Sequence, residues 1–209
     1  MNSPLPGKDL VPPQEKGGKT DTSHSTTLKT VEDAAELYKV AKNRLLDVSN
    51  WDKLCGPLTG TFFLRDDQGN KVNRLAKPGD YLKIDVPGPG SETGDGYDWV
   101  HIETIDEKQL ENGKEEIAVK VRPAQNPLRK KAATAHFFKE DATSTFIISR
   151  HGNVVTAEVH GRNEQPNIKL AHAMDNVRNA LMALSAILGF STTQWRQLVK
   201  GLVSIQKLR

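Results

Sequence analysis

The apolar residues of this chain change their spacing twice, and this change constrains the fold more than any other feature. From residue 31 to 47 they recur every three or four positions, which indicates an amphipathic helix. From residue 58 to 122, and again from 143 to 160, they occur in short β-prone runs, separated by turn residues such as Gly, Pro, Asn and Asp. From Leu170 to Leu188 the helical spacing returns. The order is therefore a possible short strand at residues 25–29, two helices, about six strands, and a long C-terminal helix.

The connections between the predicted strands are too short for parallel pairing, which needs crossovers of a dozen or more residues. Asn112-Gly113 is a strong hairpin signal within this region. A long amphipathic helix buries its apolar stripe by covering one face of such a sheet. We therefore expect an α+β fold in which an antiparallel curved sheet of about six strands wraps around the long C-terminal helix. The alternative is a small SH3-like barrel over residues 58–123, followed by a helical segment.

The element order resembles that of the START-like (SRPBCC) proteins, whose helix-grip fold curls a sheet around a C-terminal helix. Two segments carry the resemblance: residues 46–51 (LDVSNW), at a break between two small helices, and residues 143–161, a hairpin before the long helix. The resemblance implies a cavity between the sheet and the helix. A further set of segments, residues 135–138, 142–146 and 161–164, resembles an uncharacterised bacterial protein family, which implies no established activity.

The chain is expected to divide into three parts. Residues 1–24 hold four prolines, three glycines and few large apolar side chains, so we predict a disordered arm. Residues 25–190 would form the helix-grip domain. Residues 191–209 begin with a capping box and carry apolar residues at helical spacing. We predict that they form an amphipathic C-terminal helix, packed on the domain or at an interface.

Charge and cysteine content narrow the class of protein. The 29 basic and 26 acidic residues nearly balance, so the net charge of +3 calls for neither nucleic acid nor an anionic membrane. The single cysteine, Cys55, rules out a disulfide within the chain and fits a reducing compartment. No signal peptide and no apolar run of about 20 residues is present. We predict a cytoplasmic protein with no nucleic-acid and no membrane partner.

Polar and aromatic residues on the predicted strands are the candidates for a ligand site. The six histidines show no zinc-site spacing, and the Gly-rich loop at residues 88–98 matches neither a calcium loop nor a phosphate-binding loop, so we expect no metal and no cofactor. If the strand faces line a cavity, polar side chains on them would orient a ligand, and a histidine beside an aspartate can act as an acid–base pair. The candidate ligand-binding residues are Asp98, Trp99, His101, Arg150, His160 and Arg162.

Two classes of function remain. The first is binding of an apolar or amphipathic small molecule in a cavity between the sheet and the C-terminal helix. The second is a non-enzymatic protein-interaction or structural module that uses the N-terminal arm or the last helix, which predicts a homodimer through residues 191–209. No motif identifies a reacting group, so the sequence leaves open whether the chain is an enzyme.

Overall fold

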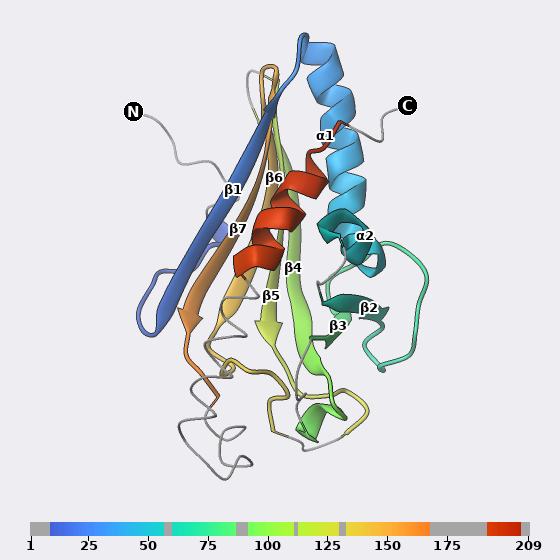
Figure 1. Ribbon diagram of the computed structural model, residues 1–209, viewed down its shortest axis with the longest axis vertical. Helices are drawn as coiled ribbons and strands as arrows, with labels where there is room; N and C mark the ends of the chain where they lie inside the picture. The colour runs from blue at the N-terminus through green and yellow to red at the C-terminus, as the bar shows by residue number, and fades with distance from the viewer. Residues whose placement is uncertain are drawn as a thin grey trace.

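The computed structural model describes residues 9–56, 60–86, 92–110, 113–129, 133–167 and 192–205. Within them one antiparallel sheet has seven strands in the order β1-β7-β6-β5-β4-β3-β2 (Figure 1). Strands β2 to β7 follow one another as a meander, and β1 pairs with β7 at the far edge. The strands are β1 (Gly18–Thr27), β2 (Thr61–Arg65), β3 (Tyr81–Asp85), β4 (Asp98–Leu110), β5 (Lys114–Pro123), β6 (Thr143–His151) and β7 (Val154–Glu164).

The two faces of the sheet differ because apolar residues alternate along its central strands. Val155, Ala157 and Val159 of β7 are fully buried, and Val159 lies opposite Phe146 of β6. Ile117, Val119 and Val121 of β5 are buried in the same core cluster. We call the face that carries these residues the inner face, and the opposite one the outer face.

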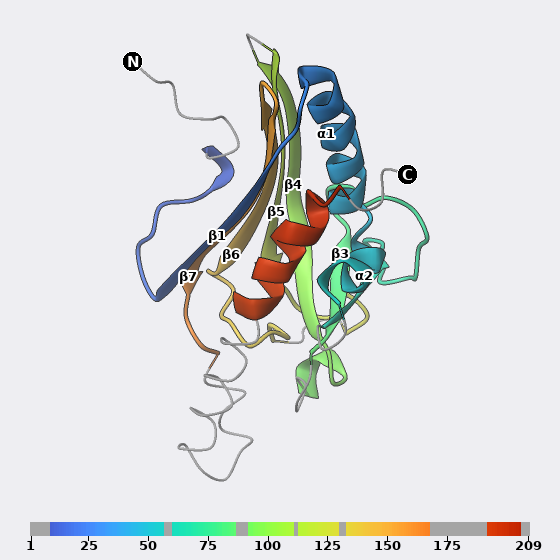
Figure 2. The same cartoon turned by 45° about the horizontal axis from the view of Figure 1, so that its top comes forward.

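All the larger helices pack on the inner face (Figures 1 and 2). They are α1 (Val31–Leu46), α2 (Trp51–Cys55) and a C-terminal helix over residues 192–202. Two three-residue 3-10 helices, η2 (Val48–Asn50) and η3 (Glu92–Gly94), precede α2 and β4. Thr30 caps α1 by accepting a hydrogen bond from the Asp33 N–H at 3.0 Å. Arg44 donates to the carbonyls of Gly201, Leu202 and Ser204, which ties the end of the C-terminal helix to α1.

The predicted α+β helix-grip fold is confirmed as a seven-stranded antiparallel sheet with a C-terminal helix packed on it. The alternative of a separate SH3-like barrel is wrong, because β5 pairs with β6 from Glu115 to Val121 and the sheet is continuous. The described helix on the sheet is the one at residues 192–202, whose Leu198 and Leu202 are at most 1% exposed. The expected long helix at residues 170–188, and with it the domain limit at residue 190, lies outside the described residues.

The N-terminal segment differs from the predicted arm. Strand β1 begins at Gly18 and pairs with β7, so residues 18–24 belong to the sheet. Upstream of it, the side-chain oxygen of Asn163 accepts hydrogen bonds from the N–H groups of Glu15 and Lys16 at 2.8 and 3.2 Å. The composition did not reveal this because an edge strand is held by backbone hydrogen bonds, which need few apolar side chains. Residues 1–8 lie outside the described residues.

Candidate functional site

A cavity of about 50 Å³ lies between the inner face and the C-terminal helix. That volume holds roughly a few water molecules or one small apolar group. Four aromatic rings from four separate elements form much of its wall: Trp51 of α2, Phe62 of β2, Phe146 of β6 and Trp195 of the C-terminal helix. An aromatic wall of this kind favours an apolar or aromatic guest.

The four rings contact one another and so fix the shape of the wall. Trp51 lies 5.2 Å from Phe62 and 4.9 Å from Phe146 between ring centroids. Trp195 closes the circle at 5.3 Å from Phe146 and 6.4 Å from Phe62. The indole N–H of Trp51 donates to the carbonyls of Arg44 and Leu45, which satisfies its polar edge where the ring is buried.

Polar groups are set into the same wall: His136, Ser144, Glu164 and Gln194. His136 Nδ1 accepts a hydrogen bond from the Phe138 N–H at 2.9 Å. Burial lowers the pKa of His136 to about 3, so the ring is neutral and carries its proton on Nε2. Gln194 Oε1 accepts from the Gly60 N–H at 3.0 Å, which leaves its amide N–H₂ as a donor. The cavity wall thus offers both donors and acceptors.

Glu164 reaches this wall because of a β-bulge at the end of β7. Thr20 lies opposite Gly161 and Gly18 opposite Glu164, so β7 has one residue more than β1 over this stretch. Asn163 adopts a left-handed conformation there, with φ of 56°. The extra residue shifts the alternation, so Glu164 lines the inner cavity although Glu158, His160 and Arg162 lie on the outer face.

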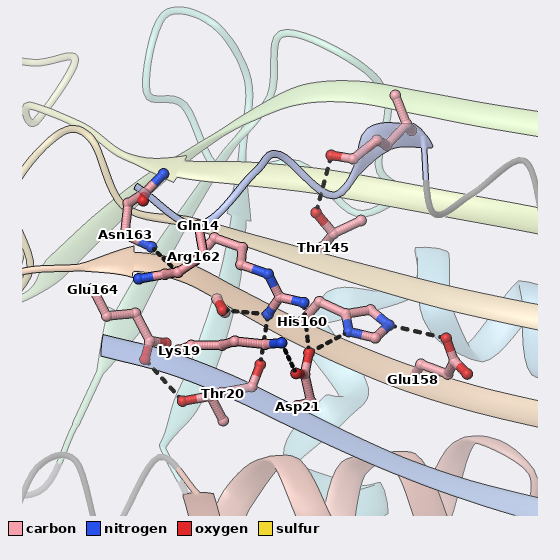
Figure 3. Close-up of polar contacts among 12 residues, drawn as sticks. Gln14, Lys19, Thr20, Asp21, Thr145, Glu158, His160, Arg162, Asn163 and Glu164 are labelled. Atoms are coloured by element: carbon pink, nitrogen blue, oxygen red, sulfur yellow. Dashed lines mark hydrogen bonds and ion pairs between the residues drawn. The ribbon is translucent and has the colours of Figure 1, made fainter. Parts of the chain in front are cut away.

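The Glu164 carboxylate is half-buried and has a hydroxyl partner. Its Oε2 accepts a hydrogen bond from the Thr20 hydroxyl at 2.8 Å (Figure 3). Burial raises the pKa of Glu164, because leaving water disfavours the charged form. An acidic group is therefore placed where an apolar cavity meets the edge of the sheet.

The candidates on β4 divide between the two faces. Asp98 is buried on the inner side, and burial raises its pKa to about 7 although the Phe137 N–H donates to it. Trp99 and His101 lie on the other side: the Trp99 indole donates to the Gly94 carbonyl at 3.2 Å, and the His101 ring packs at a tilt against Tyr81, 4.9 Å away between ring centroids. The structure therefore does not bring Asp98 and His101 together as an acid–base pair.

The candidates on β6 and β7 have charged partners within the chain. Arg150 donates to Glu115 at 2.6 Å, near the β6–β7 hairpin. His160 lies between Asp21 and Glu158 at 2.6 and 2.9 Å, and these hydrogen bonds, the one with Glu158 first, raise its pKa.

Arg162 joins this group on the outer face. It pairs with Asp21 at 2.8 Å and donates to the carbonyls of Gly161 and Thr20 (Figure 3). Hydrogen bonds from His160 and Arg162 outweigh the opposing effect of burial and lower the pKa of Asp21 to about 2. Two of the six candidates thus meet in one cluster, Arg150 lies elsewhere, and a ligand-binding role for all six stays a prediction.

Sequence reasoning favoured a structural role for Glu164 over a place at a cavity mouth, and it did not identify His136 and Trp195 as wall residues. For Glu164 a signal was present, because Gly161 and Asn163 are residue types that tolerate the backbone of a bulge. For His136 and Trp195 no local pattern places them beside strands far away in the sequence. In the described part of the chain, no group of three or more His, Cys, Asp or Glu is placed to hold a metal ion. No helix among these residues is long and apolar enough to cross a membrane.

No known family model matches this sequence, and no curated protein matches it. Several solved structures are similar in fold. The hypothetical protein jhp0584 from Helicobacter pylori is 13% identical over 86% of each chain, with a TM-score of 0.44. Norcoclaurine synthase from Thalictrum flavum is 8% identical, with 94% of this chain and 99% of that chain covered and a TM-score of 0.39. Major latex-like protein 151 from Panax ginseng is 14% identical, with 87% and 96% covered and a TM-score of 0.36. These neighbours are SRPBCC (Bet v1-like) proteins, the helix-grip group that the sequence resembles.

Proposed function

We propose that this chain binds a small apolar or amphipathic molecule in the cavity between the sheet and the C-terminal helix. The observation that carries the proposal is the hollow walled by four aromatic rings, with a few polar groups set among them. Ligand sites combine these two features, because apolar walls supply affinity and a few polar groups fix orientation.

The size of the cavity limits the occupant. A volume of about 50 Å³ accommodates a small group but not a long lipid chain. A six-membered ring needs a cavity of about 150 Å³, so it enters only if Trp195, the wall residue that the C-terminal helix contributes together with Gln194, moves aside. We therefore expect the protein to bind compact molecules, such as a single six-membered ring with a short substituent.

The alternative function, an interaction module built on the last helix, has less support. Leu198, Val199 and Leu202 of this helix, and Val203 directly after it, are each at most 1% exposed, because they pack into the core of their own chain. The large apolar side chains that are exposed among the described residues, Val31, Leu75, Leu128 and Ile205, come from four separate segments. Dimerisation through residues 191–209 would require another surface of the helix.

A pair of serine variants on one strand tests the proposal. Ser144 lines the cavity, whereas Ser149 lies on the outer face of the same strand, opposite Thr156. Titration with benzyl alcohol, followed by tryptophan fluorescence, measures binding. We expect saturable binding to the wild type, a loss of about tenfold or more in Ser144→Leu, whose side chain fills the hollow, and little change in Ser149→Leu. Absence of saturable binding to the wild type, or equal effects of the two variants, would contradict the proposal.

A further inference from the structure

A second hollow opens beside the cavity at the edge of the sheet. It has a volume of about 330 Å³ and lies between the start of β1 and the first turn of the C-terminal helix, where Thr20 and Thr192 line it. Phe138, Glu164 and Trp195 line both this outer hollow and the inner cavity. The two hollows therefore meet at two aromatic rings and one carboxylate.

The surroundings of Glu164 leave space for its carboxylate at this junction. A Cβ atom at position 161 would overlap Glu164 Oε1, so the glycine there makes room for the side chain. Thr20 holds the other oxygen, Oε2, through its hydroxyl. The bulge at Asn163, the glycine at 161 and the Thr20 hydroxyl together hold the carboxylate between the two hollows.

Nearby cations compensate the negative charge of the Glu164 carboxylate poorly. Lys19 and Arg162, the cations nearest to it along the two strands, both pair with Asp21, at 3.1 and 2.8 Å. Among the described residues, Thr20 is its one hydrogen-bond partner, and this hydroxyl carries no charge. A half-buried carboxylate whose nearest described cation, Arg162, already pairs with another carboxylate is costly, and a cationic guest would reduce that cost.

The geometry points to a ligand with a protonated amine and a compact apolar or aromatic body. The amine lies at Glu164 in the outer hollow, and the body packs against Phe138 and Trp195 and enters the inner cavity. Aromatic faces also attract a cation, so the walls favour the same end of the molecule as the carboxylate does. This inference rests on the function proposed above and adds the chemical class of the ligand.

Benzylamine, benzyl alcohol and benzoate test it, because they share one ring and differ in charge. Isothermal titration calorimetry at pH 7 compares them on the wild type, on Glu164→Gln and on the control Glu158→Gln, a change on the outer face of the same strand. We expect the wild type and Glu158→Gln to bind benzylamine about tenfold more tightly than benzyl alcohol, with benzoate weakest. In Glu164→Gln the preference for the amine should disappear while benzyl alcohol still binds.

The outcomes separate this inference from the proposed function. Equal affinity of the wild type for the amine and the alcohol would overturn the amine assignment but leave the cavity as a binding site. An amine preference that survives in Glu164→Gln would also overturn it, because another group would then be responsible. If none of the three compounds binds the wild type, both the inference and the proposed function fail.

Discussion

The acidic side chains on the two faces of the paired strands β1 and β7 have opposite surroundings. On the outer face, Asp21 and Glu158 enclose His160, and Asp21 also pairs with Arg162. On the inner side, Glu164 has the Thr20 hydroxyl beside it and apolar walls around it. A cluster whose charges are already paired supports the fold, whereas a carboxylate short of partners at a cavity is suited to a ligand.

The largest expected effect comes from the aromatic wall on the inner side. Phe146 is 1% exposed and contacts both Trp51 and Trp195, so Phe146→Ala removes the centre of the wall. We expect the free energy of unfolding to fall by about 3–5 kcal/mol. Urea denaturation followed by circular dichroism measures it. A loss below about 1 kcal/mol would mean that the rings are not packed as described.

The outer cluster should affect stability without affecting the ligand. Asp21→Asn removes the charge that Arg162 and His160 share, and because Asp21 is 40% exposed we expect a loss of only about 1 kcal/mol. Benzyl alcohol affinity should stay unchanged, because Asp21 does not line the cavity. A marked drop in affinity with little change in melting temperature would show that the ligand binds at the outer face. The outer cluster would then serve binding and not stability.

Replacing Glu164 should raise stability at neutral pH, whereas replacing Asp21 should lower it. Burial raises the pKa of Glu164, so the native state disfavours the charged form. The wild type therefore loses stability as pH rises from the pKa of the unfolded state to the higher pKa of the folded state. We expect Glu164→Gln to melt at a higher temperature than the wild type at pH 7 and at the same temperature near pH 4. Differential scanning fluorimetry at the two pH values is sufficient. A lower melting temperature at pH 7 would assign Glu164 a structural role.

The smallest effect concerns the protonation of His160. Its pKa is raised by Glu158 and Asp21, so its contribution to stability is complete below the unfolded value of about 6.5 and is lost as pH rises through the folded value. Asp21 contributes above about pH 4 and loses this contribution as pH falls toward its folded pKa of about 2. We therefore expect His160→Gln to reduce stability at pH 6 and to have less effect at pH 9. Equal effects at both pH values would count against a protonated His160.

The elements with strong periodicity could be predicted from the sequence. The stripe of Ala34, Tyr38, Ala41 and Leu45 on α1 is buried as its spacing indicates. The alternation of β5 likewise places Val119 inward. Where apolar residues dominate one face, burial selects a single register, and the sequence pattern is sufficient to predict which face is buried.

The candidate site was harder to predict, because the decisive features are not periodic. A one-residue bulge at Asn163 changes which face Glu164 occupies, and alternation alone gives the wrong face. Strand β1 contains mostly polar residues, so composition indicated a possible strand only from residue 25 and did not mark residues 18–24 as part of the sheet. The cavity wall joins Trp51, Phe146 and Trp195, residues that are neighbours only after the sheet has formed.

Native mass spectrometry of the freshly purified protein tests the central claim, ligand binding in this cavity, most directly. The account predicts an additional small mass on the folded protein, either as purified or after incubation with benzylamine, that disappears on denaturation and is weakened in Ser144→Leu. A bare mass in both samples, under conditions gentle enough to keep the protein folded, would contradict it.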